Sequence, residues 1–145
     1  MKNLAQLWPF WAVLSAVFAA LTAIFAKVGV DKVNSDYATF MRTLVILPVL
    51  GLILFMTGSW QNPSSVSPRS WLFLALSGLA TGASWVCYFR ALKLGDAARV
   101  APIDKLSVVL VAVFAVTFLG ERLSAPNWFG IVLIGAGAFL VAYQA

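Results

Sequence analysis

The feature that most constrains this chain is a series of five long apolar runs within 145 residues. A helix rises about 1.5 Å per residue, so about 20 apolar residues cross a hydrocarbon layer of about 30 Å. Apolar residues make up 62% of the chain, more than a soluble domain of this length can hide in its interior. We therefore predict an all-α integral membrane protein with one transmembrane domain over residues 1–145. Its five membrane-spanning helices are expected at about 4–26, 36–58, 70–92, 97–119 and 127–143.

The segments between the runs support these boundaries. Asn34, Ser35 or Asp36 is expected to cap the second helix, and the Pro- and Ser-rich segment SWQNPSSVSPRS indicates a linker before the third. The first apolar run is longer than the about 7 to 15 residues of a signal-peptide core, so we expect a retained helix. An odd number of helices places the two termini on opposite sides of the membrane.

The basic residues predict the orientation, because cytoplasmic loops carry an excess of Lys and Arg. We expect an inner (plasma) membrane protein with its N-terminus outside and its C-terminus in the cytoplasm. The bias is modest and leaves insertion in both orientations open. The cations are scattered singly between apolar runs, so they indicate topology and no nucleic-acid surface. Lys2, Arg69 and Arg122 belong to the N-terminal side, and Lys27, Lys32, Arg90, Lys93 and Arg99 to the other.

Enzyme chemistry has little support in the composition. His is absent, which removes the commonest proton shuttle, the usual metal ligand and the base of most nucleophilic couples. The single cysteine, Cys87, lies inside an apolar run, so no disulfide forms within one chain. We expect no catalytic residue, no metal site and no cofactor.

The fourth run contains the most informative charges. Its uncharged part, from Leu106 to Leu119, spans only about 21 Å as a helix, so the helix must begin earlier. A start at Ala97 places Pro102 inside the helix, where proline removes one hydrogen bond and produces a kink or break. Transporters often build binding sites from such broken helices.

Asp104 and Lys105 follow this expected break. In the alternative interpretation Pro102 is the first helical residue, and Asp104 is a first-turn acid that complements the helix dipole. That alternative leaves Lys105 unexplained, and charges within membrane spans are usually functional. We therefore predict that Asp104 and Lys105 contact a substrate or a coupling ion.

The partners of these charges can also be predicted. Adjacent helical residues point about 100° apart, so Asp104 and Lys105 are expected to pair with other helices. Arg42, about 10 Å along the second helix from Ser35, is the partner expected for Asp104, although a snorkelling Arg42 is the alternative. Lys105 would then lack a negative partner, and a substrate carboxylate or phosphate would supply it.

Aromatic and small residues complete the candidate site. Trp85 and Tyr88 are expected either to line a cavity or to pack in the core. The small faces formed by Gly78 with Gly82, and by a Gly-spaced last helix, indicate a seam within a bundle or dimer.

Several stretches together resemble the EamA-type domain of the drug/metabolite transporter superfamily. They are FMR (Phe40 to Arg42), YFRALKLGDAARVAP (Tyr88 to Pro102), FLGERLS (Phe118 to Ser124) and the last helix. The resemblance implies one half of a ten-helix inverted-repeat fold, similar to the short five-helix bacterial and archaeal transporters. It also implies a homodimer, either antiparallel or parallel, because one unit needs a partner. Asp104 and Lys105 depart from the pattern of larger relatives, so their substrate preferences do not carry over.

We therefore predict a secondary transporter that exports small metabolites, such as amino acids or related solutes, by alternating access around a polar cavity. Its partners would be the solute, membrane lipid and a second copy of the chain. A non-catalytic membrane subunit or assembly factor of a larger complex is the alternative.

Overall fold

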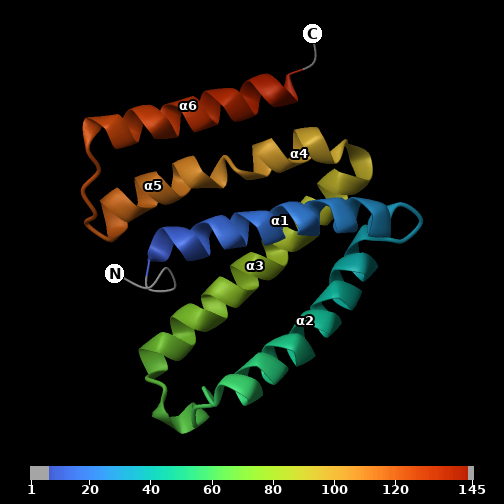
Figure 1. Ribbon diagram of the computed structural model, residues 1–145, viewed down its shortest axis with the longest axis vertical. Helices are drawn as coiled ribbons and strands as arrows, with labels where there is room; N and C mark the ends of the chain where they lie inside the picture. The colour runs from blue at the N-terminus through green and yellow to red at the C-terminus, as the bar shows by residue number, and fades with distance from the viewer. Residues whose placement is uncertain (1–6, 144–145) are drawn as a thin grey trace. The chain divides into compact units, whose positions relative to one another are not determined.

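The computed structural model describes residues 7–143, and this part of the chain is helical without a strand (Figure 1). Five helical stretches are long and apolar enough to cross a membrane, with α4 and α5 together forming the fourth. The predicted all-α class and five spans are confirmed. The predicted start of the first helix at residues 4–6 lies outside the described residues. The elements are α1 (Trp8–Val30), α2 (Ser35–Thr57), the short 3₁₀ helix η2 (Pro63–Ser65), α3 (Pro68–Leu94), α4 (Ala97–Asp104), α5 (Ser107–Phe118) and α6 (Ala125–Ala142).

Local sequence signals explain where α2 begins and ends. Of the three predicted caps, Asn34 is the one used: its Oδ1 accepts the N–H groups of Asp36 (2.9 Å) and Tyr37 (3.2 Å). Pro48 lies inside α2 without ending it. Gly58 ends the helix in a left-handed conformation, with φ of 63°, which glycine adopts without steric cost.

The chain divides into two compact units. We call residues 1–25 and 94–145 the terminal unit, and residues 26–93 the central unit. In the terminal unit, α6 packs against both α4 and α5. In the described part of this unit the buried apolar residues are all alanines, which allow close helix approach. These are Ala23, Ala112, Ala115 and Ala138.

Gly135 on α6 lies close to α5. A Cβ atom added at Gly135 would lie 3.3 Å from Cγ2 of Val109 on α5. No atom lies within 4 Å of the corresponding position at Gly78, Gly82, Gly130 or Gly137. Thus the predicted glycine faces are open within the chain, and Gly135 makes the contact that sequence reasoning missed.

The buried residues of the central unit are larger. Val30 and Leu92 are fully buried, Phe89 is 3% exposed, and the buried Thr39 hydroxyl donates to the Ser35 carbonyl (2.9 Å). Together with Ala26 they form a small core where α1 ends, α2 begins and α3 ends. Phe89 of this core lies beside the Arg42 guanidinium, and Arg90 follows Phe89 on α3.

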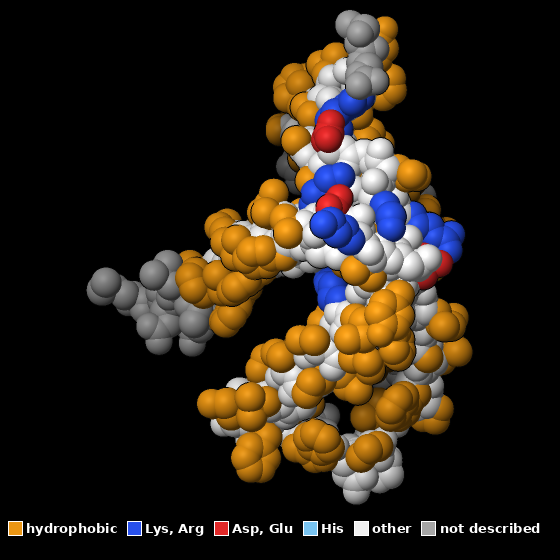
Figure 2. All heavy atoms as spheres, turned by 90° about the vertical axis from the view of Figure 1, so that its right-hand side faces the viewer, with side chains coloured by type: hydrophobic (Ala, Val, Ile, Leu, Met, Phe, Trp, Pro, Cys, Tyr) orange, Lys and Arg blue, Asp and Glu red, His pale blue; other side chains and the backbone are white. Residues whose placement is uncertain are grey.

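Most large apolar side chains lie on the outside of the helices. Figure 2 shows hydrophobic side chains covering much of the visible helical surface. A water-soluble protein rarely exposes apolar surface on this scale, whereas lipid or a second protein chain covers it readily. The surface is therefore that of a multi-pass membrane protein.

The end of α5 explains the GE dipeptide in FLGERLS. Gly120 has φ of 70°, and the Glu121 N–H donates to the Ala115 carbonyl (3.1 Å), closing the helix end. Among residues 7–143, the ion pairs are Arg90 with Asp36 and Lys105 with Asp104. Glu121 and Arg122 are adjacent but form no ion pair with each other.

Candidate functional site

The fourth span is broken, as predicted, but the break lies beyond Pro102. α4 and α5 are separated by Lys105 and Leu106. Backbone bonds there tighten to a three-residue spacing, from Leu106 N–H to Ile103 O (3.0 Å) and from Val108 N–H to Lys105 O (3.0 Å). Such 3₁₀ geometry within a helix often marks a hinge.

The start of this span is also as predicted. α4 begins at Ala97, and Pro102 is inside the helix, so the alternative with Pro102 as the first helical residue is wrong. Asp96 occupies the cap position in an extended conformation, but its side chain makes no capping hydrogen bond. Its carbonyl instead accepts the N–H groups of Arg99 (3.0 Å) and Val100 (2.9 Å).

Asp104 and Lys105 lie at the break and pair with each other. Lys105 Nζ is 3.1 Å from Asp104 Oδ2, and the two side chains are 55% and 34% exposed, respectively. The expectation that each would pair only with another helix is wrong for this contact. Lys105 lies at the end of α4, where the regular helical spacing stops, so its long side chain can fold back onto its neighbour. Lys105 is thus not the unmatched cation that we predicted.

Arg42 occupies a different setting, in the central unit. Its guanidinium carbon lies 4.1 Å from the centroid of the Trp85 ring and 5.5 Å from that of Phe89. Tyr88 lies on α3 together with these two rings and is half-buried. It is near enough to interact electrostatically with Arg42. The structure therefore brings Arg42, Trp85 and Tyr88 together. Asp104 belongs to the other unit, and its pairing with Arg42 stays a prediction.

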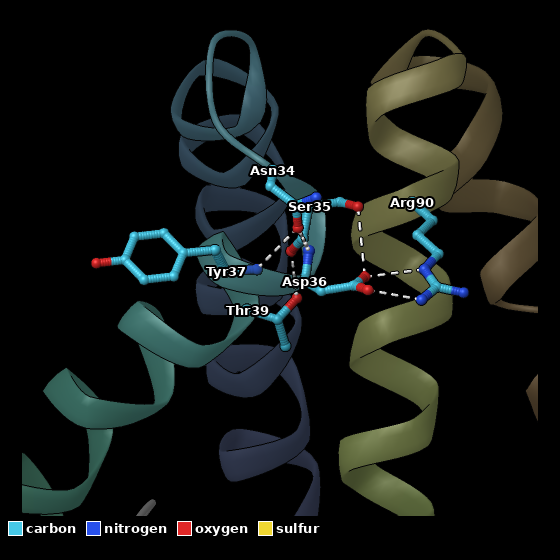
Figure 3. A network of polar contacts seen from close by, with 6 residues as sticks. All are labelled: Asn34, Ser35, Asp36, Tyr37, Thr39 and Arg90. Atoms are coloured by element: carbon cyan, nitrogen blue, oxygen red, sulfur yellow. Dashed lines mark hydrogen bonds and ion pairs between the residues drawn. The ribbon is translucent and has the colours of Figure 1, made fainter.

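A second charged cluster joins the start of α2 to the end of α3. Arg90 binds the Asp36 carboxylate with two hydrogen bonds, Nε to Oδ1 (2.8 Å) and Nη2 to Oδ2 (2.6 Å), as Figure 3 shows. Sequence reasoning assigned Asp36 to capping and Arg90 to topology. Both residues were expected near the membrane side opposite the N-terminus, and this position alone does not predict that they pair.

Two lysines strengthen the same end of the central unit. Lys27 Nζ donates to the Leu92 carbonyl (2.8 Å), and Lys93 Nζ donates to the Val33 carbonyl. Lysines near a helix C-terminus satisfy carbonyls that lack helical partners. Lys27 is itself part of α1, which continues past its predicted end at residue 26 to Val30.

In the terminal unit Arg99 performs a similar role. Its Nη2 donates to the carbonyl of Ala142 (2.9 Å), the last residue of α6. A cation at this position is favourable because the C-terminal end of a helix carries partial negative charge. Arg99 was predicted only as a topology signal, and the structure gives it a packing role between α4 and α6.

The charge balance differs between the two units. The central unit contains six basic and two acidic residues, a formal net charge of +4, whereas the rest of the chain contains four and three. Of the two acidic residues, Asp36 is engaged by Arg90. The surplus positive charge is therefore concentrated in the unit that contains Arg42.

Comparison with known proteins identifies the family of this chain. The profile of the EamA-like transporter family matches residues 6–143, so the chain belongs to this family of membrane transporters. A Sinorhizobium protein described as an uncharacterized transporter in cobO 3'region is 66% identical over 139 residues. That alignment covers 96% of this chain and 99% of the relative.

More distant relatives differ in length. An uncharacterized protein of Methanocaldococcus jannaschii is 26% identical, and the alignment covers 89% of this chain and 91% of the relative. The uncharacterized transporter YxxF of Bacillus subtilis is also 26% identical over 90% of this chain, but only 40% of YxxF is covered. No solved structure matches the chain. The predicted family is confirmed. Some relatives are covered almost completely by this chain, whereas less than half of YxxF is covered.

Proposed function

We propose that this transporter exports small metabolites, such as amino acids or related solutes, by alternating access. The observation that carries the proposal is the break between α4 and α5, which holds the Asp104–Lys105 pair within a largely apolar span. Ionisable groups beside a helix break are suited to binding a polar solute or a coupling proton in the membrane. Asp104 and Lys105 are assigned to solute binding or ion coupling. Arg42, Trp85 and Tyr88 are assigned to solute binding, and a carboxylate is the expected anionic group.

A homodimer would complete the transport unit around a central polar cavity. The alignment covers only 40% of YxxF but 99% of the Sinorhizobium relative, which supports a role for two copies of a single domain over residues 1–145. The open faces at Gly78 and Gly82 and the exposed apolar side chains provide surfaces for such contact. An inverted pair of five-helix subunits is antiparallel, and a parallel dimer is the alternative. The inner membrane, with the N-terminus outside, is the proposed location.

Uptake by proteoliposomes tests this function. The purified full chain would be reconstituted and offered amino acids, organic anions and lipophilic cations, with and without a proton gradient. We expect a transported solute whose flux falls at least about tenfold in Asp104→Asn and Lys105→Ala, as expected for loss of a charged contact. Glu121→Gln, an acid in the loop after α5, is the matched control and should transport normally.

Two results would contradict the proposal. Normal flux in both Asp104→Asn and Lys105→Ala would remove the assigned site while keeping the transport function. A lack of flux for every solute in the panel would instead favour the alternative of a membrane subunit in a larger complex.

A further inference from the structure

The setting of Arg42 suggests what this side chain binds. Trp85 and Phe89 are four residues apart, so they lie on one face of α3 on successive turns. Both contribute ring faces to the Arg42 guanidinium, at 4.1 and 5.5 Å. Phe89 is only 3% exposed, so its ring is packed in the core. The guanidinium therefore lies over two aromatic rings of α3.

Ring faces leave the hydrogen-bonding capacity of arginine unused. A guanidinium carries five N–H donors directed outward in its own plane, whereas a cation–π contact engages its flat face. Within residues 26–93 the Arg42 guanidinium makes no hydrogen bond and no ion pair. Asp36, one of only two acids in that unit, is occupied by Arg90.

The unbonded edge of Arg42 is also accessible. Among the described residues, no side-chain nitrogen or oxygen is both buried and without a hydrogen-bond partner. The Arg42 side chain is half-buried and lies about 10 Å along α2 from Ser35, within an apolar span. A cation at such a depth is stabilised by an anion that can reach it.

We infer that Arg42 is an oxyanion site that binds a carboxylate or phosphate through two parallel N–H···O bonds. Trp85 and Phe89 act as the platform that orients the guanidinium. This inference rests on the proposed function in that it assigns the anionic group of the solute to Arg42. Lys105, whose charge is already engaged by Asp104, does not carry that role.

The geometry specifies arginine and not only positive charge. A carboxylate or phosphate matches the planar fork of arginine in a bidentate arrangement, whereas lysine offers a single rotatable ammonium. Arg42→Lys keeps the charge, so it separates fork recognition from general electrostatic attraction. Trp85→Leu keeps Arg42 but removes the ring on which it is held.

The same central unit provides a matched control. Arg69 lies over the ring of Phe73 at 5.9 Å, near the start of α3. It is also an arginine with an aromatic neighbour, but the contact is longer and Phe73 is exposed. Arg69→Lys should therefore leave anion binding unchanged.

Equilibrium binding tests the inference without requiring transport. The full chain in a phosphate-free detergent would be titrated with inorganic phosphate and with amino acids paired with their amides, which lack the carboxylate, following tryptophan fluorescence. We expect anions to bind and the amides to bind at least about tenfold more weakly. Arg42→Lys, which keeps the charge but loses the planar fork, should bind the anions more weakly than the unmodified chain. Trp85→Leu should also weaken anion binding, and Arg69→Lys should match the unmodified chain. Circular dichroism would establish that each variant keeps its helices.

A second arm identifies the source of the oxyanion. The detergent-solubilised chain would be titrated with phosphatidylglycerol and with an uncharged diacylglycerol. Competition between phosphatidylglycerol and the soluble anion that depends on Arg42 would support the oxyanion site and identify a lipid phosphate as an occupant. Absence of such competition would support a solute as the occupant.

The outcomes separate this inference from the proposed function. Equal anion binding by Arg42→Lys and the unmodified chain, or no anion binding by either, would overturn the oxyanion site even if solutes are transported. Binding that depends on Arg42 in a chain that transports nothing would support the site and overturn the transport proposal.

Discussion

The two charged settings inside this protein differ in how the chain stabilises them. Arg42 lies in the uninterrupted helix α2 and is held by aromatic rings from α3, whereas Asp104 and Lys105 lie at a helix break and pair with each other. In the first setting a single charge is fixed in place and its hydrogen-bonding edge stays open. In the second, the charges offset each other beside an irregular backbone. A charge in a membrane span can thus be stabilised in two ways. Side chains of another helix contact Arg42, whereas an adjacent residue at a helix break contacts Lys105.

The largest expected effect on stability comes from removing the buried Phe89 ring beside Arg42. Phe89→Ala deletes a buried ring and should lower the free energy of unfolding by about 3–5 kcal/mol, because the site cannot collapse fully. Reversible unfolding in mixed detergent micelles would measure the change. Phe73→Ala, whose ring is 58% exposed, is the control and should change stability by less than about 0.5 kcal/mol. Equal effects would show that Phe89 is not part of a packed core.

The neutral pair at the break can be tested by a double-mutant cycle. Asp104→Asn and Lys105→Met should each destabilise the protein, and the double variant should lose less than their sum. We expect a coupling of about 0.5–1 kcal/mol from unfolding in micelles, since the pair is partly exposed. The adjacent but unpaired Glu121 and Arg122 provide the control cycle, with coupling near zero. Additive effects at residues 104 and 105 would contradict the ion pair.

The packing next to the break should respond to a single methyl group. Gly135→Ala places a Cβ atom 3.3 Å from Val109 on α5, so Val109 must shift. Gly137→Ala meets no atom within 4 Å and gains only the better helix propensity of alanine. We expect Gly135→Ala to unfold more easily than Gly137→Ala by about 1 kcal/mol. The opposite order would indicate that the Gly137 face is covered, as in a dimer seam.

The smallest effect is expected from the exposed clamp between α2 and α3. Asp36→Asn removes the carboxylate that binds Arg90 but keeps a side chain of the same size. Because both side chains are solvent-accessible, we expect a slight decrease in stability that disappears at high salt concentration. Parallel unfolding measurements at low and high salt would test this, with Asp31→Asn as a nearby acidic control. A large decrease that persists in high salt would mean that the pair is shielded from solvent.

The positions of the helices were largely predictable, since hydrophobic length is a local property of the sequence. The start at Ala97 and the interior Pro102 followed from counting residues against the membrane thickness. The location of the break did not follow, because it depends on backbone bonds at Lys105 and Leu106 that no residue type signals. The proposed site residues stay predictions, whereas Lys105, which we expected to be an unmatched cation, is paired with Asp104.

By itself, the sequence determined the membrane class, the five spans, the family resemblance and the residues that carry charge into the apolar spans. Those properties depend on composition and spacing along the chain. Only the tertiary structure decided which charges are engaged: Arg90 with Asp36, Lys105 with Asp104, and Arg42 with Trp85. The physical reason is that a side-chain contact depends on helix rotation and side-chain reach in space. A linear pattern of apolar and charged residues specifies neither.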